Sequence, residues 1–260
     1  MTETSGEYKE LHFNLHEIIW GEGFMSSGGP AAVAAILDNT DIAGKDVLDI
    51  GCGLGGPSIL LASGHGASSV IGIDIQKEQV ERASTLAAKK GVAEKVSFRI
   101  VEPGPLPFSE ATFDIAFSDG VIVQIPDKQA LFEEIYRVLR DGGSFVAGDF
   151  LTEVNPDTSE IIAEHREKSG LTFHFETPGK TQDLLSSVGF RDVTLHDNTE
   201  TLIRLLKDEI PRISTNGDLH QKIADVLGEE MADRPARSWK RMLAMAEKRE
   251  MVDYHIHAIK

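Results

Sequence analysis

Cysteine is almost absent from this chain of 260 residues, which holds one, Cys52. A single thiol excludes an internal disulfide, so we expect the chain in a reducing cytoplasm. Long apolar runs are missing as well, and none approaches the roughly 20 residues that a membrane-spanning helix requires. The first residues are acidic and polar, which does not match a secretory signal peptide. The sequence therefore predicts neither a disulfide framework nor a membrane segment.

Basic residues are also scarce. Lysine and arginine together number 26 against 42 aspartates and glutamates, and the formal net charge is −16. A field of this sign repels phosphate backbones and anionic lipid surfaces, which argues against nucleic acid and membranes as partners. We expect a small polar molecule as the partner, and a monomer or a homodimer.

Strand-like and helical segments alternate between Asp46 and Phe150, which predicts a parallel sheet with right-handed crossovers. Strands are expected at about residues 46–50, 69–75, 96–101, 113–118, 143–150, 191–196 and 251–258. The last strand is expected to be antiparallel and to lie between the fifth and the sixth. Helices are expected at about residues 8–20, 30–37, 57–63, 77–90, 128–140, 157–169 and 179–188, and over most of 200–250, with turns at Pro211, Asn216-Gly217 and Pro235.

The stretch from Val47 to Gly56, VLDIGCGLGG, is typical of a buried strand that runs into a glycine-rich turn. Glycine allows positive φ angles and a close approach of the backbone to a ligand. A helix that begins at about Pro57 offers free N–H groups and a positive dipole end. Asp49 would face an ammonium group better than a pyrophosphate, and Asp74 ends the next strand, where such folds place a carboxylate on ribose hydroxyls. The glycine spacing by itself leaves nicotinamide and flavin cofactors open.

These motifs resemble motif I and the ribose acid of class I S-adenosylmethionine (SAM) methyltransferases. The likeness continues through Leu106-Pro107-Phe108, Thr112-Phe113-Asp114 and the VLRDGG segment at 138–143, and it covers about residues 45–150. It implies an α/β, Rossmann-like fold with a seven-stranded, mostly parallel sheet and helices on both faces. SAM is the implied cofactor and S-adenosylhomocysteine the product.

The resemblance also implies how the chain is divided. We interpret residues 1–260 as a single methyltransferase domain with an N-terminal lid (1–45), a SAM-binding core (46–150) and an acceptor-side half (151–260) that carries a helical insert at about 200–250. The expected SAM-binding residues are Met25, Ser26, Asp49, Gly51, Gly53, Asp74, Ile75, Gln79, Glu102, Pro103 and Ser118.

The N-terminal segment carries a more specific likeness. Residues 20–29, WGEGFMSSGG, are similar to a segment of phosphoethanolamine N-methyltransferases. By this resemblance Tyr8 is the catalytic tyrosine, and Gln124 stands where the family has a histidine that pairs with it. A glutamine forms hydrogen bonds but cannot accept a proton at neutral pH. The residues expected to contact the acceptor are Tyr8, His12, His16, Phe150 and Trp239.

The missing histidine shapes the expected chemistry. A thioether such as methionine has an open lone pair at every pH, whereas an ammonium group must first lose a proton. We therefore expect methyl transfer from SAM to the N or S atom of a small polar metabolite. The acceptor is a thioether, or it is an amine or phosphobase if Tyr8, His12 or His16 takes the proton.

Three alternatives remain open at this point. They are a phosphoethanolamine-type N-methyltransferase proper, a SAM-binding regulator without turnover, and a nicotinamide-dependent dehydrogenase. His12 and His16 have the spacing of zinc ligands on one helix face, but no third ligand is evident, so no metal is expected.

Overall fold

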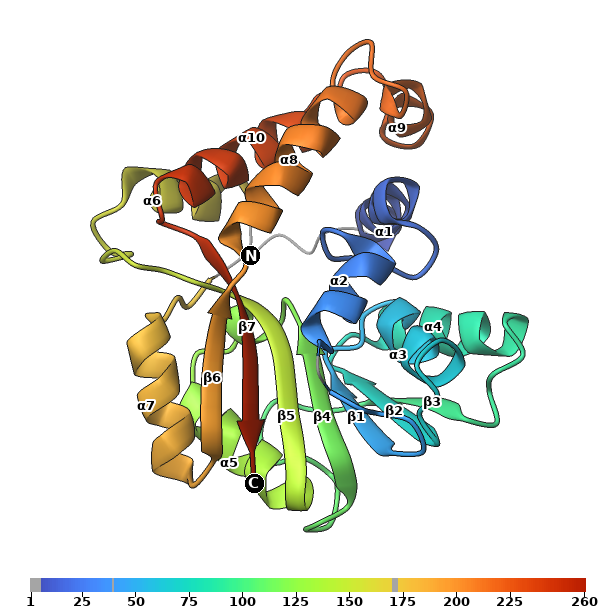
Figure 1. The fold of residues 1–260 in the computed structure, drawn as a ribbon. Coiled ribbons are helices and arrows are strands. Elements are labelled where there is room, and N and C mark those ends of the chain that lie inside the picture. Colours follow the sequence, from blue (N-terminus) through green and yellow to red (C-terminus); the bar gives the residue numbers. More distant parts are fainter. Residues whose placement is uncertain (1–5, 39, 170–172) are drawn as a thin grey trace.

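A computed structural model describes residues 6–38, 40–169 and 173–260 of the chain. At its centre lies a seven-stranded sheet in the order β3-β2-β1-β4-β5-β7-β6 (Figure 1). The strands are β1 (Asp46–Ile50), β2 (Ser69–Asp74), β3 (Val96–Ile100), β4 (Phe113–Asp119), β5 (Leu139–Leu151), β6 (Arg191–Asp197) and β7 (Val252–Ile259). β7 pairs antiparallel with β5 and β6, while the other pairs are parallel. The predicted fold class and the place of the last strand are confirmed.

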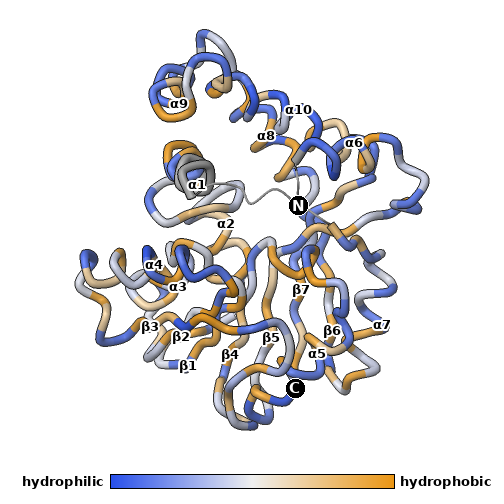
Figure 2. The backbone as a smooth tube through the Cα atoms, turned by 180° about the vertical axis from the view of Figure 1, so that it is seen from behind, coloured by the Kyte–Doolittle hydropathy of each residue, from blue (hydrophilic) through white to orange (hydrophobic). Residues whose placement is uncertain are grey.

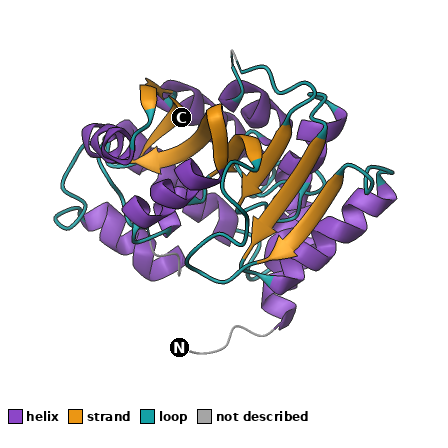
Figure 3. Cartoon of the chain, turned by 90° about the horizontal axis from the view of Figure 1, so that it is seen from below, coloured by secondary structure: helices purple, strands orange, loops and turns teal. Residues whose placement is uncertain are grey.

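Helices cover both faces of the sheet (Figure 3). One face packs against α2 (Gly29–Ile36), α3 (Gly56–Ser63) and α4 (Lys77–Lys89), and the other against α5 (Lys128–Val138) and α7 (Pro178–Val188). A parallel strand that is covered on both faces needs apolar residues at successive positions. In β1 the adjacent residues Val47 and Leu48 are both fully buried. The helix α5 repeats its apolar residues at a spacing of three to four, which buries Phe132, Ile135 and Val138.

A separate helical layer stands beyond the carboxyl ends of β4 and β5 (Figure 1). It consists of α6 (Glu160–Ser169), α8 (Thr199–Ile213), α9 (His220–Leu227) and α10 (Arg234–Glu247). The N-terminal helix α1 (Gly6–Trp20) lies beside α9 and shares an apolar core with this layer (Figures 1 and 2). None of the described helices is long and apolar enough to cross a membrane.

The strand order reverses between β1 and β4, so the carboxyl ends of these two strands form the expected ligand site. From β1 the chain winds outward through β2 and β3, and then returns to the other side of β1 with β4. β1 and β4 are direct neighbours, and Ile50 lies opposite Ser118 in their register. Ligands of open α/β sheets bind at the carboxyl ends of strands where the order reverses in this way.

Three local expectations were wrong. Pro211 lies inside α8 rather than in a turn, although the helix ends within its next turn, at Ile213. Pro235 falls at the start of α10, where the missing N–H has no intrahelical partner in any case. The helix expected to reach residue 140 ends at Val138, because Leu139 already pairs with Phe113 as part of β5.

We expect Phe132→Ala to lower the free energy of unfolding by about 3–5 kcal/mol, because the ring is fully buried against Phe145 and its loss leaves a cavity. Chemical denaturation followed by circular dichroism measures this. Met231→Ala is the matched control, since Met231 is 38% exposed, and its effect should stay within about 0.5 kcal/mol. A similar small loss for both variants would contradict the assigned core.

Candidate active site

The glycine-rich turn after β1 has the backbone that its sequence predicts. Gly51, Gly53 and Gly55 have φ angles of 73°, 52° and 87°, a region that side chains disfavour. The backbone N–H of Gly51 donates to the Ile73 carbonyl oxygen at 2.8 Å, which ties the turn to β2. A Cβ atom at Gly51 would lie 2.3 Å from a methyl carbon of Val121. The turn is therefore fixed between β2 and the loop that follows β4.

Asp74 closes the turn from the side of β2. Its Oδ2 atom accepts the Gly53 N–H at 3.1 Å, and its Oδ1 atom accepts the Gln76 N–H at 2.9 Å. The side chain is 9% exposed, and burial raises the pKa of the carboxyl group. The next residue, Ile75, is 59% exposed despite its apolar side chain. A carboxylate and an open apolar surface thus lie side by side at the carboxyl end of β2.

Asp49 lies beneath the turn rather than on its surface. It is 1% exposed, and its Oδ2 atom accepts the Ser58 hydroxyl at 2.5 Å. Burial, with Asp74 as a further repelling charge, raises its pKa to about 7. Ser118 is also fully buried, and its hydroxyl donates to the Ile50 carbonyl oxygen at 3.2 Å. Both side chains hold β1, α3 and β4 together at the edge where the other predicted residues gather.

The remaining residues predicted on the cofactor side follow β2 and β3. Gln79 lies in the first turn of α4, where its N–H donates to the Gln76 carbonyl oxygen at 3.1 Å. Glu102 and Pro103 are exposed and follow β3, which ends at Ile100. All of them lie at the same edge of the sheet as Asp74.

The segment after α1 covers the glycine-rich turn. The Gly23 carbonyl oxygen accepts the Gly56 N–H at 2.9 Å, so the segment is bonded to the start of α3. The sulfur of Met25 lies 3.3 Å from where a Cβ atom of Gly53 would stand. This segment therefore brings Met25 to the glycine-rich turn and Ser26 beside Gly120, which follows β4.

An acid at the end of β4 was missed by the sequence reasoning. Asp119 forms a side-chain hydrogen bond with Ser26, and burial together with the nearby Asp253, Asp149 and Asp49 raises its pKa to about 8. The signal was present, because Asp119 ends a strand just as Asp74 does.

Asp149 in β5 was missed too. It accepts the N–H groups of Ile122, Val123 and Phe150 at 2.5, 3.0 and 2.7 Å. Burial raises its pKa to about 7. Asp149 thereby fixes the short turn (Ile122–Gln124) that follows β4. Gln124 itself is exposed, and its amide donates to the Gly120 carbonyl oxygen at 3.3 Å.

Residues 42–224 match a family model described as a methyltransferase domain. The chain belongs to this methyltransferase family. An O-methyltransferase, cnsE of Penicillium expansum, is 32% identical over 195 residues, which cover 72% of this chain and 68% of that protein.

Other relatives of this methyltransferase domain are longer. Phosphoethanolamine N-methyltransferase 1 of Triticum aestivum is 31% identical over 230 residues, which cover 87% of this chain and 44% of that protein. The chain thus spans about half the length of such curated relatives. A phosphoethanolamine N-methyltransferase 2 of Haemonchus contortus, solved with phosphomonomethylethanolamine and S-adenosylhomocysteine, is similar in fold, with a TM-score of 0.86, 24% identity, and coverage of 98% of this chain and 58% of that one.

A clamp of two tryptophans and Glu209 joins the N-terminal helix α1 to the helical layer. Trp20 in α1 stacks on Trp239 in α10 with ring centroids 5.4 Å apart. Their indole N–H groups donate to the two carboxylate oxygens of Glu209 in α8, at 2.8 and 2.7 Å. His16 stacks on Trp20 at 5.0 Å, and Phe150 packs against the same core. The side chains of Tyr8 and His12 lie outside the described part of the structure.

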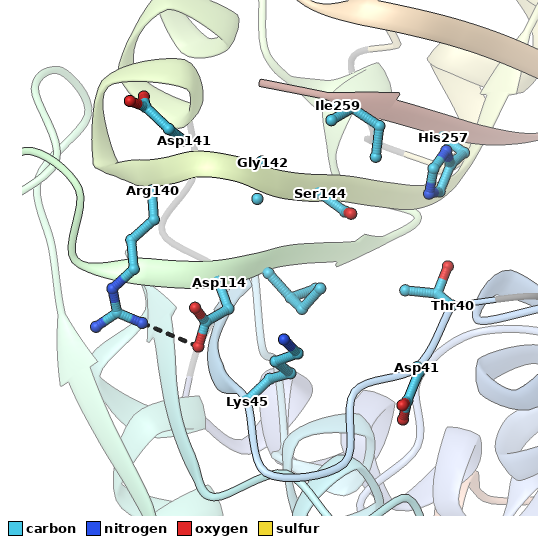
Figure 4. A pocket seen from close by; sticks show the side chains of 12 residues that line it. Thr40, Asp41, Lys45, Asp114, Arg140, Asp141, Gly142, Ser144, His257 and Ile259 are labelled. Atoms are coloured by element: carbon cyan, nitrogen blue, oxygen red, sulfur yellow. Dashed lines mark ion pairs between the residues drawn. The ribbon is translucent and has the colours of Figure 1, made fainter.

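Among the described residues, no group of three His, Cys, Asp or Glu side chains is arranged to hold a metal ion. A separate hollow lies at the opposite edge of the sheet, around Asp114 at the start of β4 and His257 near the end of β7 (Figure 4). Its Arg140 is already paired with Asp114 at 2.9 Å and with Asp46 at 3.1 Å. This hollow lies at the amino ends of the parallel strands, whereas the candidate active site lies at their carboxyl ends.

We expect Glu209→Ala to destabilise the methyltransferase by about 1–3 kcal/mol, because the buried indole N–H of Trp239 and the half-buried one of Trp20 both lose their acceptor. Unfolding monitored by tryptophan fluorescence measures both the stability and the tryptophan environment. Glu209→Gln keeps one acceptor oxygen and should lose less. If the alanine variant were as stable as the parent, the clamp would have no energetic role.

Proposed function

We propose that this chain is a SAM-dependent N-methyltransferase that acts on a small amine of the phosphobase class. Family membership removes the dehydrogenase alternative, since the matched model is a methyltransferase domain. Of the N and S acceptors left open by the sequence, the relatives named for phosphoethanolamine favour nitrogen. A SAM-binding regulator without turnover remains the outcome that a negative assay would support.

The observation that carries this proposal is the pairing of Asp74 with Ile75 beside the glycine-rich turn. A carboxylate held by two backbone N–H groups suits the two hydroxyls of a ribose, and the exposed isoleucine suits the face of an adenine. Gln79, Glu102 and Pro103 lie along the same edge and extend this surface. The residues present therefore fit the nucleoside part of SAM.

The amino-acid part of the cofactor is assigned to the turn between β1 and α3. Gly51 and Gly53 let the backbone approach a ligand, while Asp49 and Ser118 hold the turn from below. Met25 and Ser26 cover it from the N-terminal side. When bound, SAM supplies an electrophilic methyl group on its sulfonium sulfur.

The acceptor is assigned to the space bordered by α1, α6 and α10. Tyr8, His12, His16, Phe150, Trp239 and Gln124 are the residues that we propose on this side. Holding two reactants in line and excluding water can supply about 7–11 kcal/mol of the rate enhancement. The clamp at Glu209 supports such closure, since it fastens α1 to the helical layer.

Two arginines support a phosphorylated acceptor. Arg166 on α6 donates to the Phe173 carbonyl oxygen at 2.8 Å, which leaves other guanidinium N–H groups available. The Nε atom of Arg241 on α10 is buried without a hydrogen-bond partner, and the charge of Arg241 acts on the nearby Glu164. Arginine is well suited to bind phosphate because its N–H groups form a planar fork. α6 and α10 pack together, so both cations come from the acceptor side.

We expect Asp74→Asn to weaken SAM binding about 10- to 100-fold, because hydrogen bonds to the charged carboxylate are lost. Isothermal titration calorimetry measures the affinity. Asp141→Asn, at the exposed start of β5 and the far edge of the sheet, is the matched control and should bind SAM like the parent. Unchanged affinity in the Asp74 variant would refute the ribose assignment.

The acceptor class is tested by incubating the protein with SAM and phosphoethanolamine, other small amines, or thioethers, and measuring S-adenosylhomocysteine. We expect product with the phosphobase. Product with thioethers alone would reverse the choice of nitrogen, and SAM binding without product from any acceptor would support the regulator.

A further inference from the structure

One face of the sheet changes character at the amino ends of β4 and β5. Ile115 in β4 lies opposite Ser144 in β5, and Ser144 lies opposite Ile259 in β7. His257 stands two residues before Ile259 and therefore on the same face, because side chains alternate along a strand. Its partner in β5, Val146, is fully buried in the core that β5 shares with α2 and α3. Core packing on this face thus gives way to a serine and a histidine beside isoleucines.

This end of the face borders the hollow of Figure 4, whose volume is about 430 Å³. Small-molecule sites commonly have volumes in this range. The loop between α2 and β1 forms another wall and supplies Thr40, Asp41 and Lys45. Asp114 and Arg140 border the hollow on the side of β4. Side chains from four separate parts of the chain thus surround one space.

Several polar groups that line the hollow have no partner in the described part of the chain. The Thr40 hydroxyl oxygen is buried and forms no hydrogen bond. The Ser144 hydroxyl, the Lys45 ammonium and the His257 ring form no hydrogen bond or ion pair with the described residues either. A buried hydroxyl without a partner is unfavourable, so a ligand that bonds to it is stabilised there. These open donors, together with the hollow itself, indicate a polar ligand.

The charges around the hollow indicate the sign of that ligand. Arg140 pairs with Asp114 at 2.9 Å, so these two charges offset each other. In Figure 4 the carboxylates of Asp41 and Asp141 point away from the hollow. Among the described residues that line the hollow, Lys45 is the cation without an ion pair. A ligand with one negative charge would supply the missing partner.

We propose that this hollow binds a small monocarboxylate with a short apolar chain. The Lys45 ammonium and the hydroxyls of Thr40 and Ser144 donate to the carboxylate. The chain of the ligand lies on Ile115 and Ile259, which are the apolar part of the lining. A doubly charged phosphate would bring more negative charge than the single free ammonium offsets, among several acids.

His257 is suited to a place at the edge of this site. Burial lowers the pKa of its imidazole, so the ring is neutral at pH 7 and donates through one nitrogen. The site is separate from the proposed function, because the hollow lies at the amino ends of the strands and the cofactor surface at their carboxyl ends. Its test therefore needs no turnover and no SAM.

The probe is sodium butyrate, titrated into the full chain at pH 7 and constant ionic strength and followed by NMR of the backbone amides. We expect saturating shifts at Thr40, Lys45 and Ser144, with a Kd on the order of 1 mM for so small a ligand. Signals around Asp74 should not move. Shifts that do not saturate, or that centre elsewhere, would overturn the site.

Two variants test the donors. Lys45→Met keeps the length of the side chain and removes the charge, so it should weaken butyrate binding about 10- to 100-fold. Thr40→Val keeps the shape and removes the hydroxyl, which should weaken binding about twofold to tenfold. Lys222→Met, at an exposed position of α9, is the matched control and should bind like the parent. Equal affinity in the parent and both hollow variants would overturn the proposal.

The chemical class is tested with two further probes. Butylammonium has the same chain with the opposite charge and should give no saturating shift in the hollow. Inorganic phosphate should bind more weakly than butyrate. Binding of butylammonium at Lys45 and Thr40 would overturn the choice of an anion, and tighter binding of phosphate would overturn the choice of a monocarboxylate.

Discussion

Parallel strands end at a common edge, and in this protein the strand order reverses at that edge between β1 and β4. Asp49, Asp74 and Asp119 are 70 residues apart at most along the chain, yet each stands at or near the carboxyl end of its strand. The register of β1 with β2 and β4 brings these ends together. The glycine-rich turn and the surface that we propose for the cofactor both depend on that pairing.

This pairing gathers several acidic side chains at the carboxyl ends of the parallel strands. Burial raises the pKa values of four carboxyl groups to about 6–8, namely those of Asp49, Asp119, Asp149 and Asp253. Each of them accepts a hydrogen bond from another part of the protein, and together these bonds hold strands and turns in place. Desolvated acids of this kind favour a bound cation. A sulfonium and an ammonium, brought together at this edge, would both meet that demand.

The closing side of the site is organised by different forces. The segment after α1 accepts the Gly56 N–H through the Gly23 carbonyl oxygen, and α1 is joined to the helical layer through Glu209. The first contact is a backbone hydrogen bond, and the second joins the half-buried Trp20 to the buried Trp239. The N-terminal segment thus contacts both the glycine-rich turn and the helical layer, and this position supports the proposal that it closes over a bound ligand.

The sequence by itself determined the strands and the glycine-rich turn, because alternating apolar runs and glycine spacing are local signals, whereas the fold class followed from the resemblance to class I methyltransferases. It also predicted that Asp74 ends a strand beside this turn. It placed Pro211 and Pro235 in turns, because proline near a helix end is tolerated for reasons that only the helix boundary reveals.

Only the tertiary structure decided which donors each buried carboxyl group accepts hydrogen bonds from. Nothing near Asp149 in the chain indicates that it binds the turn after β4, since its partners lie about 26 residues away. Likewise, Glu209 acquires its two tryptophan partners from α1 and α10. The charge state of a buried carboxyl depends on the donors and charges that packing brings to it from distant parts of the chain, and the sequence does not record that proximity.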